Sequence, residues 1–470
     1  MLNGAFGAAR EALRWVTDAA VSDGGGATWP RSRAPGAALS DDLYAGTAGV
    51  LAALAEATLS GITDFDSHAQ AAATRLRRLS SPESWAGFIA DPGDSDATPG
   101  NPDFGLYTGL SGCATALDMW ASVSSDREAG AAARSLMGSV AEVAATGQPV
   151  STSPDLLSGE AGVLLAIVEI GDEHTGPAAS MIADRIVAGA QWIDGEPDWP
   201  RVSGNSVFTP NFSHGAAGIG YALAAASAAL DRPDLLDVAL AAGRRLVRLG
   251  TRPDGTLAVP YSVRQSPGTP TRRCAPCDPD TPAGPGTPAG PGTPAGPDGA
   301  DALVGYGWCH GPTGTLRIFE VLDLLQPGQG WADRAAASRQ AVRTSGLTQR
   351  LYPGFWDNLG RCCGTAGVGE MALDRYQETS DTRWLEWAIS LAADVLGRSV
   401  SDNRGIRWSN TEHRRTPSSL EPEVGWMQGA AGIAGWLLRL ARVTRDGPAA
   451  WRIRWPDRSI THSLNTITLS

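Results

Sequence analysis

The sequence lacks any apolar run of about 18 residues, the length that a membrane-spanning helix requires. It contains no lysine and has a net charge of −12, which argues against a surface for nucleic acid or anionic membranes. Six cysteines in 470 residues are too few for a disulfide scaffold. The N-terminus, MLNGAFGAAREALRWVTDAA, reads as an amphipathic helix and not as a signal peptide. We therefore expect a soluble, cytoplasmic protein.

Glycine is abundant, and much of it follows one pattern. A Gly-x-x-Gly motif recurs seven times, and each copy opens an apolar, helix-like run. One copy alone means nothing, but seven in phase with helices indicate internal repeats. The glycine pairs are Gly46 and Gly49, Gly109 and Gly112, Gly159 and Gly162, Gly215 and Gly218, Gly311 and Gly314, Gly364 and Gly367, and Gly429 and Gly432.

One spacing between motifs, the fourth, is longer than the others by roughly 40 residues. It contains TPAGPGTPAGPGTPAGPDG, which has no large apolar residue to bury. This composition predicts a disordered, extended insertion at about residues 264–302.

Between the motifs lie second helix-like stretches, which carry more arginine and aspartate than the motif runs. Examples are residues 2–21, 131–145, 177–193, 233–249, 331–347 and 382–399. The apolar runs fit an inner ring of helices and the charged stretches an outer ring. No polar capping repeat is visible, so the pattern favours a closed ring over an open solenoid. We expect residues 1–470 to form one all-α domain, an α/α toroid of seven inner and seven outer helices.

Three cysteines stand one or two places before motif glycines: Cys309 in the fifth motif, and Cys362 and Cys363 in the sixth. In a toroid, neighbouring inner helices would bring all three to one rim. Backbone at a helix start is not yet helical, so adjacent side chains there can converge, and the helix N-terminus favours thiolates. Three thiolates with a vacant fourth position are typical of catalytic rather than structural zinc. The alternative is that these small residues are merely buried.

The remaining cysteines give weaker signals. Cys113 follows its motif glycine and lies inside a predicted helix, so we expect a structural role. Cys274 and Cys277 form a Cys-x-x-Cys at the edge of the Pro/Gly tract. No second Cys-x-x-Cys and no strand–helix context accompany it, so neither a zinc site nor a redox pair is predicted, and the role of these two cysteines stays open.

Two further residues are candidates by position. His214 immediately precedes Gly215, so it should face the same central cavity as the cysteines. Asp155 lies four residues before Gly159, on the loop that enters the third motif. An aspartate there could be functional or could cap the helix N-terminus.

The stretches GWCHGPTG, CCGTAG, SHGAAGIG and DLYAGTAGV resemble the lanthionine synthetase C-like (LanC-like) family of zinc-dependent cyclases. The glycine repeats extend this resemblance from about Asp42 to Leu440. The Trp-Cys pair followed by a later Cys-x-Gly within a seven-fold repeat is specific to that family. The resemblance implies an α/α toroid, in agreement with the repeat count.

The resemblance also implies roles for particular residues. The zinc ligands would be Cys309, Cys362 and Cys363, an all-cysteine variant, because Cys363 stands where histidine is more common. His214 and Asp155 match the catalytic histidine and aspartate of the family. His310 falls where members have tyrosine or histidine, and it could donate to the substrate or only line the pocket. Some members have an arginine shortly before the Trp-Cys pair, and DALVGYGWC has none.

The implied reaction is thioether ring closure in a ribosomally made peptide. A substrate cysteine would bind Zn²⁺ as a thiolate and add to the β-carbon of a dehydroalanine or dehydrobutyrine, and His214 would protonate the enolate. Three cysteine ligands leave a formal charge of roughly −1 on the site, which predicts a more nucleophilic but less acidified thiolate than a Cys-Cys-His site gives. The chain has no kinase signature, so we expect the precursor peptide to be dehydrated by a separate kinase/lyase or dehydratase.

Two alternatives keep the zinc. The enzyme could add glutathione or another small thiol to dehydroamino acids, or the chain could be a non-catalytic zinc scaffold in a peptide-modifying complex. A glycosidase with a similar toroid would need paired carboxylates across its cavity. The motif starts offer cysteine and histidine instead, so this alternative is disfavoured.

Overall fold

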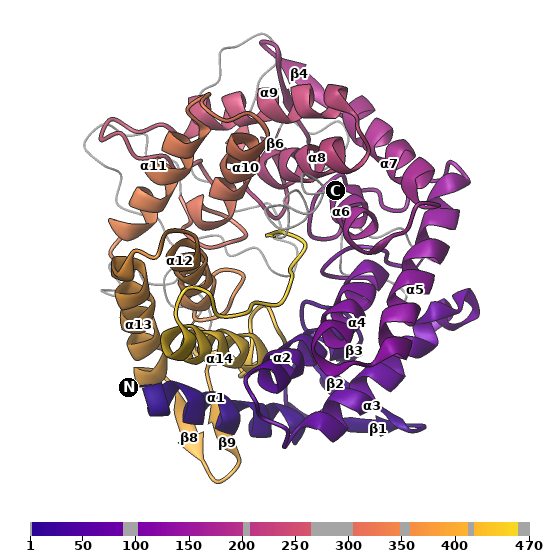
Figure 1. Cartoon of the computed structure of the whole chain (residues 1–470), viewed down its shortest axis with the longest axis vertical. Coiled ribbons are helices and arrows are strands. Elements are labelled where there is room, and N and C mark those ends of the chain that lie inside the picture. Colours follow the sequence, from indigo (N-terminus) through magenta and orange to yellow (C-terminus); the bar gives the residue numbers. More distant parts are fainter. Residues whose placement is uncertain are drawn as a thin grey trace. The chain divides into compact units, whose positions relative to one another are not determined.

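The computed structural model describes residues 2–87, 102–200, 207–264, 304–347, 358–411 and 418–458 (Figure 1). Within these ranges there are fourteen α-helices, accompanied by short antiparallel strands. Seven helices begin at a Gly-x-x-Gly motif, and we call them motif helices. The other seven alternate with them along the chain, and we call them flanking helices. The predicted sets of seven and seven are confirmed.

The motif helices are α2 (Thr47–Leu59), α4 (Leu110–Ser124), α6 (Glu160–Ile170), α8 (Ala216–Ala229), α10 (Pro312–Leu325), α12 (Thr365–Thr379) and α14 (Ala430–Asp446). The flanking helices are α1 (Leu2–Thr17), α3 (Asp66–Arg77), α5 (Arg127–Ala145), α7 (Gly176–Ala188), α9 (Pro233–Gly250), α11 (Trp331–Arg343) and α13 (Thr382–Gly397).

The two sets differ in burial as their sequences predict. In α8 every residue from Ala216 to Ser227 is buried, because the helix is apolar on all sides. In α9 the buried residues follow a helical period and leave charged residues such as Asp234 and Arg248 on the other face.

Short antiparallel strands lie between the flanking helices and the loops that follow them. One sheet is formed by β1 (Val21–Asp23), β2 (Gly26–Pro30) and β3 (Leu39–Ser40). The others are two-stranded pairs: β4 (Gln191–Ile193) with β5 (Glu196–Asp198), β6 (Val207–Phe208) with β7 (Val263–Arg264), and β8 (Val400–Asp402) with β9 (Gly405–Arg407).

Two predicted helix ends are wrong, because short strands follow the helices there. The helix expected to reach residue 21 ends at Thr17, and the one expected to reach residue 193 ends at Ala188. Asp194 and Gly195 both have positive φ, as a two-residue type I′ hairpin turn requires, so the preceding residues pair as a strand. The other predicted flanking helices end within a few residues of the observed ends.

Three of these hairpins are fastened to the preceding flanking helix by a tryptophan. The indole Nε1 of Trp29 donates to the carbonyl of Val16 at 3.0 Å. Trp199 and Trp408 each donate in the same way, at 2.8 Å, to a carbonyl thirteen residues earlier. Carbonyls of the last helical turn have no partner within the helix, so each tryptophan satisfies one of them.

The chain divides into two compact units. The first comprises residues 1–85, 112–136 and 347–454, and the second comprises residues 86–111, 137–346 and 455–470. In the first, α14 packs against α1, α2 and α12, so the first helix of the chain lies beside the last (Figure 1). In the second, α8 packs against α6, α9 and α10.

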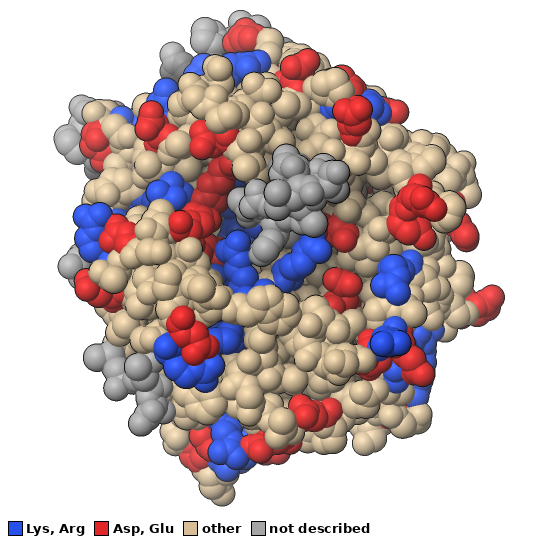
Figure 2. Space-filling view, viewed as in Figure 1, with Lys and Arg blue, Asp and Glu red and all other residues tan. Residues whose placement is uncertain are grey.

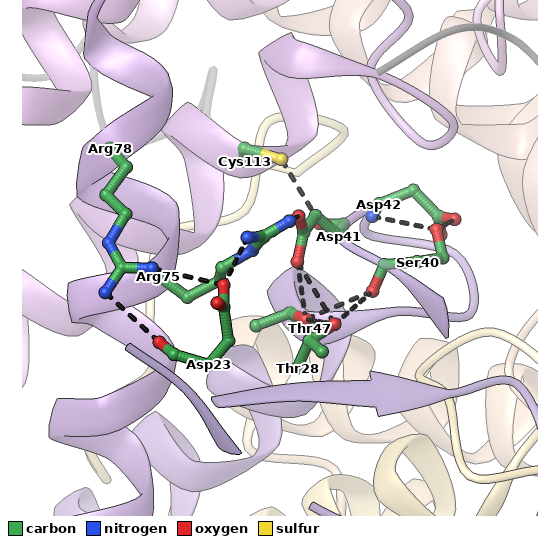
Figure 3. Close-up of polar contacts among 9 residues, drawn as sticks. All are labelled: Asp23, Thr28, Ser40, Asp41, Asp42, Thr47, Arg75, Arg78 and Cys113. Carbon is green, nitrogen blue, oxygen red and sulfur yellow. Dashed lines mark hydrogen bonds and ion pairs between the residues drawn. The ribbon is translucent and has the colours of Figure 1, made fainter. Parts of the chain in front are cut away.

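In the first unit, Asp41 joins the first motif loop to α3 and to the N-terminal hairpin (Figure 3). Its carboxylate accepts hydrogen bonds from Thr47 Oγ1 at 2.8 Å and from Arg75 Nε and Nη2 at 2.9 and 2.7 Å. Arg75 also pairs with Asp23 of β1. The backbone oxygen of Asp41 contacts the buried Cys113 Sγ at 3.2 Å, in line with the structural role expected for Cys113.

The motif glycines stand where backbone atoms leave no room for a side chain. A Cβ on Gly162 would lie 2.2 Å from the carbonyl oxygen of Leu156, and one on Gly432 would lie 1.7 Å from that of Trp426. The first glycines are equally crowded, since a Cβ on Gly215 would lie 1.3 Å from the oxygen of Thr209. The absence of a Cβ therefore lets each loop fold back onto the first turn of its helix.

Charged residues of both signs are intermixed on the face drawn in Figure 2. The blue residues there are all arginines, because the sequence contains no lysine. In the described ranges, no helix is both long enough and apolar enough to cross a bilayer. The predicted insertion at about 264–302 lies, apart from Arg264 at the end of β7, outside the described residues, as do Cys274 and Cys277.

We predict that Gly162→Ala lowers the free energy of unfolding by about 2–3 kcal/mol, because the new Cβ would meet backbone that cannot swing aside. Gly138 in α5 is the matched control, since a Cβ there meets nothing within 4 Å. Gly138→Ala should be neutral or stabilise by up to about 1 kcal/mol. Urea denaturation followed by circular dichroism compares the two variants, and equal stabilities would contradict the packing role of Gly162.

Candidate functional site

In the second unit, backbone hydrogen bonds join the loops of four successive motifs. Each bond involves the residue two places before the first motif glycine. The N–H of Tyr107 donates to the carbonyl of Leu157 at 2.9 Å, and Leu157 donates to Ser213 at 3.1 Å. Ser213 in turn donates to Cys309 at 3.1 Å. We call this series the backbone ladder.

The first unit contains a ladder of the same kind. The N–H of Cys362 donates to the carbonyl of Met427 at 2.8 Å, and Met427 donates to Tyr44 at 2.9 Å. All three residues again lie two places before a motif glycine. Since each ladder fixes the register between neighbouring loops, the residues one place further on are also brought side by side within each unit.

We call that next place, immediately before the glycine, the pre-glycine position. In the fourth to seventh motifs it is occupied by His214, His310, Cys363 and Gln428. The candidate catalytic histidines and one candidate zinc ligand thus occupy equivalent places in the repeat. The ladder positions of the fifth and sixth motifs carry the other two candidate ligands, Cys309 and Cys362.

Asp155 and His214 form a direct pair in the second unit. Their Oδ2 and Nδ1 atoms lie 2.7 Å apart, and the aspartate side chain is 2% exposed against 17% for the histidine. The other carboxylate oxygen, Oδ1, accepts the backbone N–H of Ser158 at 2.8 Å. Asp155 therefore supports the turn before α6 and holds His214, but it does not cap the helix, because the N-cap residue of α6 is Gly159 and receives no side-chain hydrogen bond.

A comparison with Asp42, the equivalent residue of the first motif, shows what the histidine does. Burial raises the pKa of Asp42, although hydrogen bonds from Ser40 and the loop N–H groups oppose the shift. Burial would raise the pKa of Asp155 too, but the neighbouring His214 and the hydrogen bonds to the carboxylate outweigh it and lower that pKa. Asp155 is thus held as a carboxylate beside His214.

His310 lies between an aromatic ring and His214. Its imidazole stacks on Tyr261 with ring centroids 4.2 Å apart and planes 10° apart. Its ring centroid is 5.9 Å from that of His214. The loop that carries Tyr261 is held by Asn211, whose Nδ2 donates to the carbonyls of Pro260 and Tyr261. The structure thus brings Asp155, His214 and His310 together in the second unit.

The loop that carries Cys309 is held from two sides. The carbonyl of Cys309 accepts two hydrogen bonds from Ser213, one from its backbone N–H and one from its hydroxyl. Ser213 directly precedes His214. The indole Nε1 of Trp308 donates to Asp457 Oδ2 at 2.6 Å. Asp457 is 2% exposed, and its backbone oxygen accepts Arg317 Nη1 at 3.1 Å. A buried carboxylate near the end of the described chain therefore fixes the tryptophan that precedes the cysteine.

In the first unit, Cys362 and Cys363 place their Sγ atoms 3.5 Å apart. A disulfide would need about 2.05 Å, whereas two ligands of one tetrahedral Zn²⁺, each about 2.3 Å from the ion, lie about 3.8 Å apart. The adjacent side chains thus converge as predicted, directly before the N-terminus of α12. Their spacing and donor chemistry fit zinc.

Arg361, just before this pair, is held by buried charges. It pairs with Glu370 of α12, which also pairs with Arg439 of α14. Its guanidinium carbon lies 4.1 Å from the centroid of the Trp426 ring. This network fixes the sixth motif loop to the seventh.

The three predicted zinc ligands are divided between the units: Cys362 and Cys363 belong to the first unit, and Cys309 belongs to the second.

Three residues near these side chains were missed by the sequence analysis. Gln428 could have been found, because it occupies the same pre-glycine position as His214 and Cys363. Tyr261 and Asp457 could not, because they lie outside the motifs and reach the site only through the tertiary fold.

The family model for lanthionine synthetase C-like proteins matches residues 37–451, so the chain belongs to the LanC-like family. Among solved structures, the chain is similar to nisin cyclase, with 14% sequence identity and a TM-score of 0.55 over 85% of this chain and 88% of that one. This likeness shows the fold, and the predicted class, an all-α protein of the α/α-toroid type, is confirmed.

Weaker similarities extend to glycoside hydrolases. A family 76 enzyme from a bovine Bacteroides thetaiotaomicron strain has 12% identity and a TM-score of 0.48 over 93% of this chain and 77% of that one. An unsaturated glucuronyl hydrolase specific for heparin has 11% identity and a TM-score of 0.45 over 94% of this chain and 98% of that one. Among curated proteins, the comparison found no match to this sequence.

We predict that the difference in the free energy of unfolding between the wild type and Asp155→Asn depends on pH. The folded-state pKa of Asp155 lies below its ordinary value of 3.8, so the carboxylate stabilises the fold above that pH, and the contribution is lost as the pH falls through the lowered pKa. Denaturant unfolding of both proteins between about pH 5 and pH 3 tests this. The difference should shrink toward acid, and a difference that stays constant over this range would contradict the assignment.

Proposed function

We propose that this protein is a zinc-dependent lanthipeptide cyclase, which forms lanthionine or methyllanthionine rings in a dehydrated, cysteine-containing precursor peptide. The observation that carries the proposal is the pair of sulfurs 3.5 Å apart before α12, in a chain of the LanC-like family. The buried Asp155–His214 pair supplies the acid–base group that such a reaction needs.

Cys309, Cys362 and Cys363 would hold the Zn²⁺, with one position left for the substrate. When bound, the ion would lower the pKa of a substrate thiol and so supply a thiolate at neutral pH. Each of the three cysteines precedes the N-terminus of a motif helix, whose dipole favours thiolates, and ladder bonds fix the backbone of Cys309 and Cys362.

His214 would deliver the proton that the enolate requires. In the reaction the substrate S–H bond breaks, a C–S bond forms at the β-carbon of the dehydroamino acid, and a C–H bond forms at the α-carbon. Asp155 holds Nδ1 of His214, so Nε2 is left to deliver a proton to the enolate. Asp155 acts by orienting the ring.

His310 would line the substrate position on the side of Tyr261. The stacked Tyr261 ring limits its rotation, so the imidazole would present a fixed hydrogen-bonding edge to the peptide. We propose that the peptide is dehydrated by a separate kinase/lyase or dehydratase before it reaches this protein.

The test is turnover of a peptide with one dehydroalanine and one cysteine. The wild type should remove the free thiol without a change in mass, because the addition is an isomerisation. Cys362→Ala should lose both zinc and activity, and His214→Ala should retain zinc and lose about 10²–10⁴-fold in kcat.

Matched controls separate these roles from general damage. Cys113→Ala alters a buried cysteine outside the proposed site, and His174→Ala alters an exposed histidine. Both should keep zinc content and activity. The cyclase proposal fails if the wild type leaves the free thiol unchanged, or if Cys362→Ala cyclises as fast as the wild type.

The same residues would also suit addition of an external thiol, so the assay is repeated with glutathione and a dehydrated protein. Preference for glutathione, seen as a gain in mass, would favour the thiol-adding alternative. Zinc binding without turnover of either substrate would favour a zinc scaffold.

A further inference from the structure

The seventh motif contains a polar residue where the neighbouring motifs carry their reactive groups. Gln428 occupies the pre-glycine position, equivalent to Cys363 in the sixth motif. The ladder bond from Cys362 N–H to the carbonyl of Met427 sets the two loops in register. Gln428 and Cys363 are therefore adjacent across the ladder, and both belong to the first unit.

The contacts of Gln428 point at the sulfur. Its Nε2 lies 3.2 Å from Cys363 Sγ and 3.1 Å from the hydroxyl oxygen of Tyr44. A hydrogen bond to sulfur is longer than one to oxygen because sulfur is larger, so 3.2 Å is a close contact. The two amide protons of one nitrogen thus have two acceptors, one on each side.

The backbone of Gln428 is held in place by the side chain of Asn410. The carbonyl of Gln428 accepts Asn410 Nδ2 at 3.3 Å, and Asn410 Oδ1 accepts the N–H of Leu359 at 3.0 Å. Asn410 therefore links the loop of Gln428 to the loop of the cysteine pair. The Asn410 side chain and the ladder bond therefore hold the backbone of Gln428 beside the loop of Cys363.

We propose that Gln428 is a positioning residue for the metal centre, which donates an N–H···S hydrogen bond to the Cys363 thiolate. This inference rests on the proposed zinc site. A thiolate has no proton and can only accept, so the amide must present its NH₂ group, as it does here. The bond would restrain Cys363 and draw charge from its sulfur.

The chemical reason lies in the all-cysteine ligand set. Three thiolates leave roughly one net negative charge on the site, which weakens the pull of the ion on a fourth, incoming thiol. A neutral donor to one thiolate withdraws some of that charge without adding a proton or a ligand. Such partners of metal ligands typically change metal affinity by about 10–100-fold when they are removed.

The experiment compares Gln428→Leu with the wild type and with Gln148→Leu, which alters an exposed glutamine outside the site. Zinc affinity is measured by competition with a chelator, and the thiolate-to-metal charge-transfer band is recorded after Co²⁺ substitution. Gln428→Leu should bind zinc about 10–100-fold more weakly and move the band to longer wavelength, since the sulfur lone pairs rise in energy. Gln148→Leu should match the wild type.

Two further variants keep the test decisive. Gln428→Asn retains the amide but is one methylene shorter, so it should behave like Gln428→Leu. Tyr44→Phe removes the second acceptor of the amide, and it should shift the band in the same direction by less. If Gln428→Leu does not fold, these two variants give the answer.

The outcomes separate this inference from the function on which it rests. A zinc content that Cys363→Ser leaves unchanged would refute the proposed site itself. Zinc that depends on Cys363, combined with an unshifted band and unchanged affinity in the Gln428 variants, would refute only the role of Gln428.

Discussion

The close contact between each motif glycine and the backbone of its own loop is the constraint on which this structure depends. Because these glycines have no Cβ, the loop can lie directly on the first helical turn, and at every motif glycine except Gly112 a Cβ would lie only 1.3–2.5 Å from a loop atom. That fold-back exposes the N–H and C=O two places before the glycine to the next loop, and the backbone ladders form there. Helix starts, loop register and the direction of the pre-glycine side chains all follow from one steric condition.

The motifs share this backbone geometry but differ in single residues at equivalent positions. The pre-glycine position is occupied by Ala45, Thr108 and Ser158 in the first three motifs, and by His214, His310, Cys363 and Gln428 in the other four. The aspartate four places before the first motif glycine also differs in its chemistry from one motif to another. Asp42 has a raised pKa from burial, whereas Asp155, beside a histidine, has a lowered one.

Much of this could be predicted from sequence, since the motif helices start at glycines and carry a strong apolar signal. The greater burial of the motif helices could also be predicted, because they are more apolar than the flanking helices. The hairpins were missed because strands of three residues are too short for a periodicity to stand out, and the Asp194–Gly195 turn was the available signal. Tyr261 and Asp457 could not be foreseen, since their contacts with His310 and Trp308 join segments far apart in the chain. The division into two units also has no counterpart in the repeat pattern.

The central claim is that three thiolates hold one zinc ion and leave a position for a substrate thiol. Zinc K-edge X-ray absorption of the purified protein tests it most directly. The expected spectrum contains three sulfur atoms at about 2.3 Å and one lighter atom, which a fourth sulfur replaces when a cysteine-containing peptide is added. Imidazole scattering with two or fewer sulfurs, or four sulfurs before any thiol is added, would contradict it.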